Sequence, residues 1–254
     1  MKNGILFGGV ALATIISGFF FCSPYKKKIV MIGHRGYSSK YMENTEQAFI
    51  AAAKHGSRGI ETDVRITKDG KLVLSHNASV KLADGRTMKV EDCSLEELTS
   101  SPLKKKAGKR GGDAFLCTFE RYLEICREYD LIAFIELKGE FPDEKIKEAF
   151  ALAEEKHDLS KCSLQSFELR NLDKAHAMFP GLNIMLTYEE NDDGWRECIE
   201  KGYDIDIDYR FISRKILRAF HERGLKVGVW TANDFFTLSR LRWYDLDYIE
   251  SDVF

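Results

Sequence analysis

The sequence contains few prolines, no linker-like stretch and almost no net charge. Only four of its 254 residues are proline, and 38 Lys and Arg residues against 40 Asp and Glu residues leave a net charge of -2. This balance gives no support for nucleic-acid binding by the chain as a whole. With 44% hydrophobic and 31% charged residues, the composition also excludes a disordered, collagen-like or disulfide-dense protein. One large globular domain or two small ones remain.

Cysteine pairs with the spacing of a zinc site are also absent. No CxxC occurs, and no histidine stands at zinc-ligand spacing from a cysteine. We therefore expect most cysteines beyond the N-terminal segment to be small buried hydrophobic residues. Their odd number disfavours a fully paired disulfide set and weakly favours a reducing compartment. These five are Cys93, Cys117, Cys126, Cys162 and Cys198.

One long uncharged run is present, close to the N-terminus. Gly4 to Ser23 contains no charged residue, and lysines flank it on both sides. As a helix, about 20 residues cross the ~30 Å hydrocarbon layer of a membrane. The run ends in bulky rings at Phe19 to Phe21, where a signal peptidase needs small side chains, so a membrane anchor over residues 1–28 is favoured over a cleaved signal. The sequence thus predicts attachment to the cell membrane, with the side of the membrane open.

After residue 28, short β-branched runs alternate with segments of helical period. This pattern predicts parallel strands joined by crossover helices. Eight strands in this space fit a closed (β/α)8 barrel over residues 29–254 better than an open sheet, which would need a Gly-rich phosphate loop after its first strand. The predicted strands cover residues 29–33, 58–66 with an extension at 72–76, 131–138, 163–167, 183–188, 203–207, 226–230 and 247–250. The predicted helices cover residues 45–55, 118–129, 143–157, 168–179, 193–201, 213–223 and 234–243.

A polar segment rich in Gly and Lys, residues 77–114, interrupts this alternation after the second strand. It is too long for an ordinary connection, and loops of this length are usually functional or disordered. Its basic run, Lys104 to Lys106 with Lys109 and Arg110, indicates either a solvated face or a surface that attracts anionic lipid or an anionic polymer.

Ionisable residues gather at the ends of the first three predicted strands. In a barrel the carboxyl ends of the strands form one rim, where catalytic groups lie. Because side chains alternate along a strand, residues two apart face the same way, as in the Glu-Thr-Asp and Glu-Leu-Lys sequences here. We expect seven side chains to converge: His34, Arg35, Glu61, Asp63, His76, Glu136 and Lys138.

The chemistry of these residues points to a metal-assisted reaction. Three carboxylates aimed at one point repel each other unless a cation neutralises them. Oxygen ligands suit Mg²⁺ or Ca²⁺ better than zinc, which makes Glu61, Asp63 and Glu136 candidate metal ligands. Arg35 and Lys138 would add positive charge for a phosphate. Two histidines could supply an acid and a base, so the residues alone predict phosphoryl hydrolysis.

The same residues carry a resemblance to a known family. The sequence is similar to the glycerophosphodiester phosphodiesterases from residue 29 to its last residue, and the motifs occur in that family's order. They are Gly33-His34-Arg35-Gly36, Glu43-Asn44-Thr45, Ile60-Glu61-Thr62-Asp63-Val64, Thr67-Lys68-Asp69-Gly70, Ser75-His76, Ile135-Glu136-Leu137-Lys138, Ser166-Phe167 and Val229-Trp230-Thr231-Ala232-Asn233.

The resemblance implies a (β/α)8 barrel that hydrolyses glycerophosphodiesters to an alcohol and glycerol 3-phosphate with one divalent cation. It implies that the three carboxylates named above hold the metal and that His34 and His76 exchange protons. It further implies that Arg35 and Lys138 bind phosphate, that Glu43 orients the base or adds a ligand, and that residues 77–114 form a small cap. Phe167 and Trp230 would line the site of the glycerol group, or else belong to the upper barrel core.

Two positions depart from the family pattern. Asn77 follows His76 where the family usually has aspartate, and the sequence ends at Phe254, which leaves the closing helix short or missing. Two other functions stay open: a phospholipase-like enzyme acting on lipid headgroups, and a catalytically inactive, membrane-tethered binding barrel. The released alcohol, the choice between Mg²⁺ and Ca²⁺, the nucleophile and the oligomeric state also stay open.

Overall fold

The computed structural model of the protein describes residues 28–254. The predicted anchor, the run from Gly4 to Ser23, lies outside these residues. Within the described part, no helix has both the length and the apolar character needed to span a bilayer.

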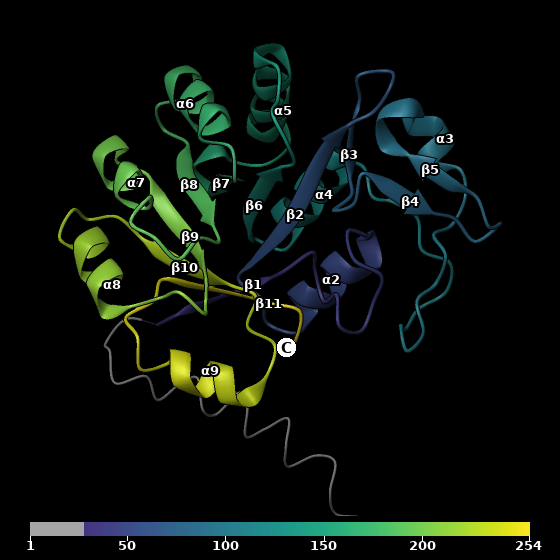
Figure 1. The fold of residues 1–254 in the computed structure, drawn as a ribbon. Coiled ribbons are helices and arrows are strands. Elements are labelled where there is room, and N and C mark those ends of the chain that lie inside the picture. Colours follow the sequence, from purple (N-terminus) through teal and green to yellow (C-terminus); the bar gives the residue numbers. More distant parts are fainter. Residues whose placement is uncertain (1–27) are drawn as a thin grey trace, which may run out of the picture.

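Eight parallel strands close into a barrel, as the sequence predicts. Neighbouring strands follow the order β1, β2, β6, β7, β8, β9, β10, β11, and β11 pairs with β1 to complete the circle. Figure 1 shows this cylinder with helices around its outside. The strands are β1 Val30–Gly33, β2 Gly59–Ile66, β6 Ile132–Leu137, β7 Cys162–Ser166, β8 Asn183–Tyr188, β9 Asp204–Asp208, β10 Val227–Trp230 and β11 Tyr248–Ser251.

The helices start where the sequence supplies a capping side chain. Thr45, Thr118, Ser213 and Asp234 each accept a hydrogen bond from a backbone N–H of the first turn of the helix that follows. The outer helices are α2 Glu46–Lys54, α4 Phe119–Glu128, α5 Asp143–Lys156, α6 Leu169–Met178, α7 Arg196–Lys201, α8 Arg214–His221 and α9 Phe235–Leu241, with a 3-10 turn η2 at Leu159–Lys161.

The barrel interior is apolar at one end and polar at the other. Ile32, Phe134, Met185 and Tyr248 form a buried cluster inside the barrel. Two residues further along, strands β6 and β11 present Glu136 and Glu250 instead. Along β6 and β11, therefore, the inward-facing residue is apolar earlier in the strand and acidic near its carboxyl end.

The insertion is a small folded unit beside β2 (Figure 1). The predicted extension of the second strand is β3, Leu72–Leu74, which folds back antiparallel to β2. Beyond it come the hairpin of β4 Ser79–Lys81 and β5 Thr87–Lys89, the 3-10 turn η1 Val90–Asp92 and α3 Leu95–Thr99. This unit has a core of its own, which includes Val73, Val80, Leu82, Leu98 and Leu103.

The chain after β11 continues without a helix through Asp252 to Phe254. The Phe254 ring packs edge-on against Tyr37, with the ring centres 5.6 Å apart. The five described cysteines are free thiols, and all except the partly exposed Cys93 are buried, which confirms their predicted role as small core residues.

Candidate active site

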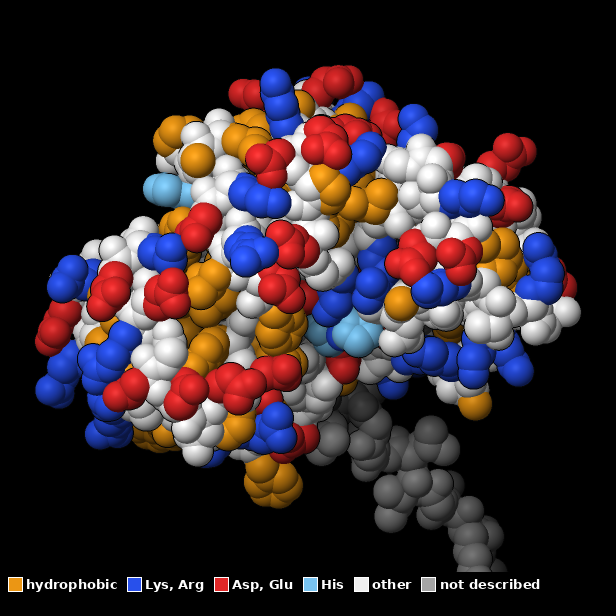
Figure 2. Space-filling view, turned by 45° about the horizontal axis from the view of Figure 1, so that its top comes forward, with side chains coloured by type: hydrophobic (Ala, Val, Ile, Leu, Met, Phe, Trp, Pro, Cys, Tyr) orange, Lys and Arg blue, Asp and Glu red, His pale blue; other side chains and the backbone are white. Residues whose placement is uncertain are grey.

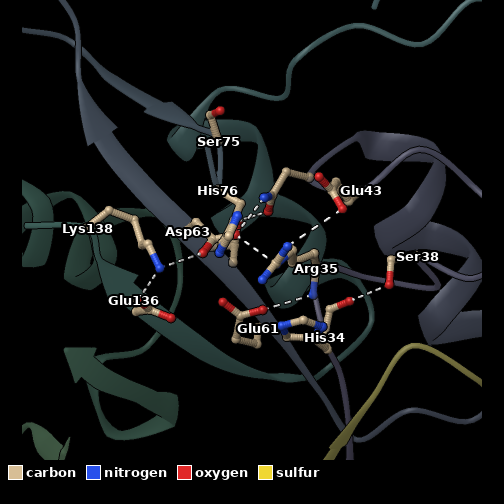
Figure 3. A network of polar contacts seen from close by, with 12 residues as sticks. His34, Arg35, Ser38, Glu43, Glu61, Asp63, Ser75, His76, Glu136 and Lys138 are labelled. Atoms are coloured by element: carbon tan, nitrogen blue, oxygen red, sulfur yellow. Dashed lines mark hydrogen bonds and ion pairs between the residues drawn. The ribbon is translucent and has the colours of Figure 1, made fainter. Parts of the chain in front are cut away.

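The seven predicted residues meet at the carboxyl ends of the first strands. Figure 3 shows them around one centre, with Glu61 and Asp63 from β2, Glu136 from β6 and His34 and Arg35 directly after β1. Carboxylate oxygens of Glu61, Asp63 and Glu136 lie within 4.8 Å of one another. The predicted convergence of acids from two separate strands is therefore present in the structure.

The environment of these carboxylates suits a cation. Glu61, Asp63 and Glu136 are 1%, 0% and 8% exposed, and Glu61 Oε1 and Asp63 Oδ1 have no hydrogen-bond partner among the described residues. Burial and the neighbouring Asp63 raise the pKa of both Glu61 and Glu136, with Glu250 adding to the effect on Glu61. Buried carboxylates that converge in this way are suited to a hard cation, so this site fits Mg²⁺ or Ca²⁺.

Arg35 and Lys138 place two positive charges beside the acids. Arg35 Nε lies 3.2 Å from Asp63 Oδ2, and Lys138 Nζ lies 2.7 Å from Glu136 Oε1 and 3.5 Å from Asp63 Oδ1. Burial tends to raise the pKa of Asp63, but these two cations hold it below its usual range. Two fixed cations against three carboxylates leave the centre acidic, and both cations border the cavity described below.

Residues behind the acids fix their positions. Asn44 Nδ2 donates to Asp63 Oδ2 at 2.8 Å, and Thr62 Oγ1 donates to Asn44 Oδ1 at 2.7 Å. The backbone N–H of Arg35 donates to Glu61 Oε2 at 2.9 Å. Arg35 and Asn44 both have φ +55°, which is uncommon outside glycine and is typical of functional loops.

His34 has a carboxylate partner that the sequence reasoning missed. His34 Nδ1 lies 2.7 Å from Asp252 Oδ1, and Ser38 Oγ and Asn233 Nδ2 donate to the same carboxylate. Burial acts to raise the pKa of Asp252, but the hydrogen bond and charge of His34, with the Ser38 and Asn233 donors, lower it to about 2. Asp252 is therefore an anion that orients the imidazole and leaves Nε2 for chemistry.

His76 stands on the insertion side of the centre in a different setting. Burial lowers its pKa, Asp63 opposes this, and Arg35 and Lys138 lower it further. Its Nδ1 lies 3.3 Å from the Asn77 side-chain oxygen, so the asparagine that replaces the family's aspartate still contacts the ring. The two imidazoles thus differ: one is paired with an anion, and the other is held close to cations.

Glu43 lies at the edge of the site. Its carboxylate pairs with Arg35 at 3.7 Å and with Lys106 of the insertion at 3.3 Å. Glu43 thus contacts Arg35, a candidate for phosphate binding. The carboxylate that contacts His34 is that of Asp252.

A cavity of about 310 Å³ opens above the barrel and includes His34, His76, Arg35 and Lys138 in its wall. Phe167 and Trp230 form one side, with their rings edge to face at 5.8 Å. Sequence reasoning named these two aromatic residues, and the structure brings both to the cavity.

The floor of this cavity was not predicted. Gln165 Nε2 donates to Asp206 Oδ2 at 2.9 Å and to Glu250 Oε1 at 2.8 Å. Burial raises the pKa of Asp206 and of Glu250 well above the ordinary range. Glu250 also lies within 4.8 Å of ligand atoms of His34 and Glu61. Strand alternation could have predicted this floor, because it turns Asp206 of β9 and Glu250 of β11 towards the barrel interior.

Comparison with known proteins agrees with this architecture. A curated glycerophosphodiester phosphodiesterase of Caldanaerobacter subterraneus is 28% identical over 232 residues, which is 89% of this chain and 94% of the relative. The crystal structure of a glycerophosphodiester phosphodiesterase from Thermotoga maritima is 28% identical with a TM-score of 0.70, covering 90% of this chain and 96% of that one.

A third similar protein is an Oleispira antarctica phosphodiesterase solved with its product sn-glycerol-3-phosphate. It is 24% identical with a TM-score of 0.78, covering 88% of this chain and 92% of that one, and at this identity it supports the fold. The sequence model of the glycerophosphoryl diester phosphodiesterase family matches residues 34–253, nearly the whole described chain. The protein therefore belongs to the glycerophosphoryl diester phosphodiesterase family of enzymes.

Proposed function

We propose that this enzyme hydrolyses glycerophosphodiesters to an alcohol and glycerol 3-phosphate, using one divalent cation and the pair His34 and His76. The observation that carries the proposal is the convergence of three buried carboxylates beside one cavity. Two cationic side chains, two imidazoles and one of these carboxylates, Glu136, line that cavity. Family membership supports the reaction class.

Glu61, Asp63 and Glu136 would hold the cation, because they supply buried carboxylate oxygens within 4.8 Å of one another. When bound, a divalent ion supplies positive charge that polarises the phosphodiester and stabilises negative charge on the reacting phosphorus group. Arg35 and Lys138 bind the phosphate oxygens from the same side of the cavity. Glu43 steadies Arg35 through their ion pair.

The two histidines carry the proton transfers. His34, oriented by Asp252, removes a proton from the nucleophile, which is water or the substrate's own glycerol hydroxyl. The nucleophile's oxygen forms a bond to phosphorus as the bond from phosphorus to the alcohol oxygen breaks. His76 gives its proton to that leaving oxygen. With the glycerol hydroxyl as nucleophile, water opens the cyclic phosphate in a second step with the proton roles reversed.

The glycerol group would lie between Phe167 and Trp230 above the polar floor. Its hydroxyls can donate hydrogen bonds to acceptors there, since Gln165 Oε1 and Asp206 Oδ1 have no partner among the described residues. A buried acceptor without a partner is costly, so a polyol that satisfies it gains binding energy.

We also propose that the protein is attached to the cell membrane. The support is the sequence alone: twenty uncharged residues from Gly4 to Ser23, flanked by lysines. Fractionation of cells that express the full chain, compared with a chain starting at Lys28, tests this. Recovery of both chains in the soluble fraction would contradict the anchor.

The reaction is tested with a panel of glycerophosphodiesters and an intact phospholipid, assayed after EDTA treatment and again with added Mg²⁺ or Ca²⁺. We expect glycerol 3-phosphate as a product only with the added ion. Cleavage of the phospholipid alone would favour the phospholipase-like function, and the absence of any turnover would favour an inactive binding barrel.

A further inference from the structure

A second cavity, of about 390 Å³, extends from the active site beneath the insertion. It shares His76 with the cavity that holds the catalytic residues, so the two meet at that imidazole. A phosphodiester carries two organic groups. With phosphorus held at the centre, one group can enter the barrel cavity and the other the cavity under the insertion.

The cavity under the insertion is basic. Four lysines line it, Lys81, Lys104, Lys105 and Lys106, against a single acid, Glu43. Glu43 is already paired with Lys106 and Arg35. In Figure 2, Lys and Arg side chains lie along the lower edge of the right-hand lobe, to the right of the pale-blue histidines near the centre.

The ammonium groups of two of these lysines have no partner among residues 28–254. Lys105 Nζ donates to the Gly111 carbonyl at 2.7 Å. The ammonium groups of Lys81 and Lys104, by contrast, make no hydrogen bond or ion pair with any residue that the structure describes. The backbones of the two residues are neighbours, because the N–H of Lys104 donates to the Lys81 carbonyl at 2.7 Å, and both side chains line the cavity. Two cations without a partner among the described residues, in the wall of one cavity, can attract an anionic group.

The barrel cavity has the opposite character. Its wall carries four acids, Glu136, Glu189, Asp206 and Glu250, beside Arg35 and Lys138, the two cations placed at the phosphate. An anionic group would find no unpaired cation at its floor among the described residues, whereas hydroxyl groups would find acceptors there. The charge difference therefore orients the substrate, with the neutral glycerol in the barrel and a charged group beneath the insertion.

The basic cavity also has an apolar wall. Met42, Val80, Leu103 and Leu116 line it together with the lysines. These side chains can pack against the carbon skeleton of an alcohol while the lysines face its charged end. His76, proposed to protonate the leaving oxygen, stands at the entrance.

The cap that the family resemblance implies would place the leaving alcohol in this cavity. We infer that this leaving-group subsite selects alcohols bearing an anionic group such as a phosphate monoester. This inference rests on the proposed function and names its substrate class. The basic run that the sequence shows, Lys104 to Lys106, then acts in substrate selection. The insertion supplies the specificity, and the barrel supplies the chemistry.

The test compares three soluble substrates with different leaving alcohols. Glycerophosphoglycerol releases a neutral alcohol, the same compound with a phosphate on its distal glycerol releases an anionic one, and glycerophosphocholine releases a cationic one. We expect kcat/KM to fall in the order anionic, neutral, cationic. Raising the salt concentration should shrink the differences, because exposed charges are screened.

The double variant K81Q/K104Q removes the two unpaired cations. Its ratio of kcat/KM for the anionic over the neutral substrate should fall by about three- to tenfold, the size expected for two exposed charge contacts. The matched control K54Q/K147Q removes two exposed lysines from α2 and α5 that line neither cavity, and it should leave the ratio unchanged. Thermal unfolding of both variants confirms that they fold.

Equal rates on the three substrates, or equal losses of the ratio in the variant and the control, would overturn the subsite while leaving the hydrolase function intact. Failure to hydrolyse all three substrates with either cation present would refute the proposed function, and the subsite with it.

Discussion

His34 and Asp252 lie 218 residues apart in the sequence, and their side chains meet at 2.7 Å between Nδ1 and Oδ1. The first strand and the last strand of the barrel are neighbours, so the closure of the cylinder itself creates this pair. An imidazole bonded to a carboxylate through one nitrogen is fixed in orientation and tautomer. Asp252 is thus a positioning residue for the proposed base.

We expect D252N to lower kcat by about ten- to a hundredfold, because the imidazole loses its orienting anion but stays in place. KM for the substrate should change by less than about twofold, since Asp252 is not among the residues placed at the phosphate. N233A, which removes one donor to the same carboxylate, should give a smaller loss. Steady-state kinetics measure both values. An unchanged kcat in D252N would remove Asp252 from the account.

The lowered pKa of Asp252 has a consequence for stability. A carboxyl whose pKa falls from 3.8 to about 2 on folding stabilises the folded state when it is ionised. That contribution is present above about pH 4 and is lost as the pH falls through about 2. D252N should therefore lower the free energy of unfolding by up to about 2 kcal/mol near neutral pH. Urea unfolding at several pH values should show this difference shrinking below about pH 4; a gap independent of pH would contradict it.

The histidine assignment predicts two large losses of rate. H34A and H76A should each lower kcat by about a hundred- to ten-thousandfold with the fold retained, because each removes one proton transfer. H176A, an exposed histidine on α6, serves as the control and should keep full activity. Circular dichroism checks the fold. Activity retained in both site variants would reject acid and base catalysis by this pair.

Gly36 holds the loop that carries His34 and Arg35, and it has φ +83°. A Cβ there would lie 2.6 Å from the backbone carbon of Ala48, so alanine would add a clash to the strained conformation. We expect G36A to lower the free energy of unfolding by about 2 to 4 kcal/mol. Gly85 in the insertion has φ +93° with open space around it, so G85A should cost about 1 kcal/mol. Equal losses in urea unfolding would show that backbone strain alone decides the effect.

Local patterns in the sequence were enough for the barrel and for most of the site. Alternation along the second and third predicted strands places Glu61, Asp63, Glu136 and Lys138 on one rim, and His76 ends the extension of the second strand. Asp252 escaped prediction because its partner stands at the other end of the chain, and only closure of the barrel brings them together.

The insertion shows the other limit of prediction. Its residues have neither the period of a long helix nor that of a long strand. The sequence therefore predicts only a charged loop, whose lysines form either a solvated face or a surface that attracts anions. The structure shows a small core and a hairpin that bring Lys81 and Lys104 to the wall of a cavity next to His76. The position of such an irregular segment depends on contacts with distant residues, which a local sequence pattern does not predict.

The cation site is the central claim, and equilibrium binding tests it most directly. Isothermal titration of the EDTA-treated and dialysed protein with Mg²⁺ and with Ca²⁺ should show one ion bound per chain. The variants E61Q, D63N and E136Q should each weaken or abolish that binding while thermal unfolding shows them folded. Absence of binding in the parent protein, or binding that these three changes leave untouched, would contradict the account.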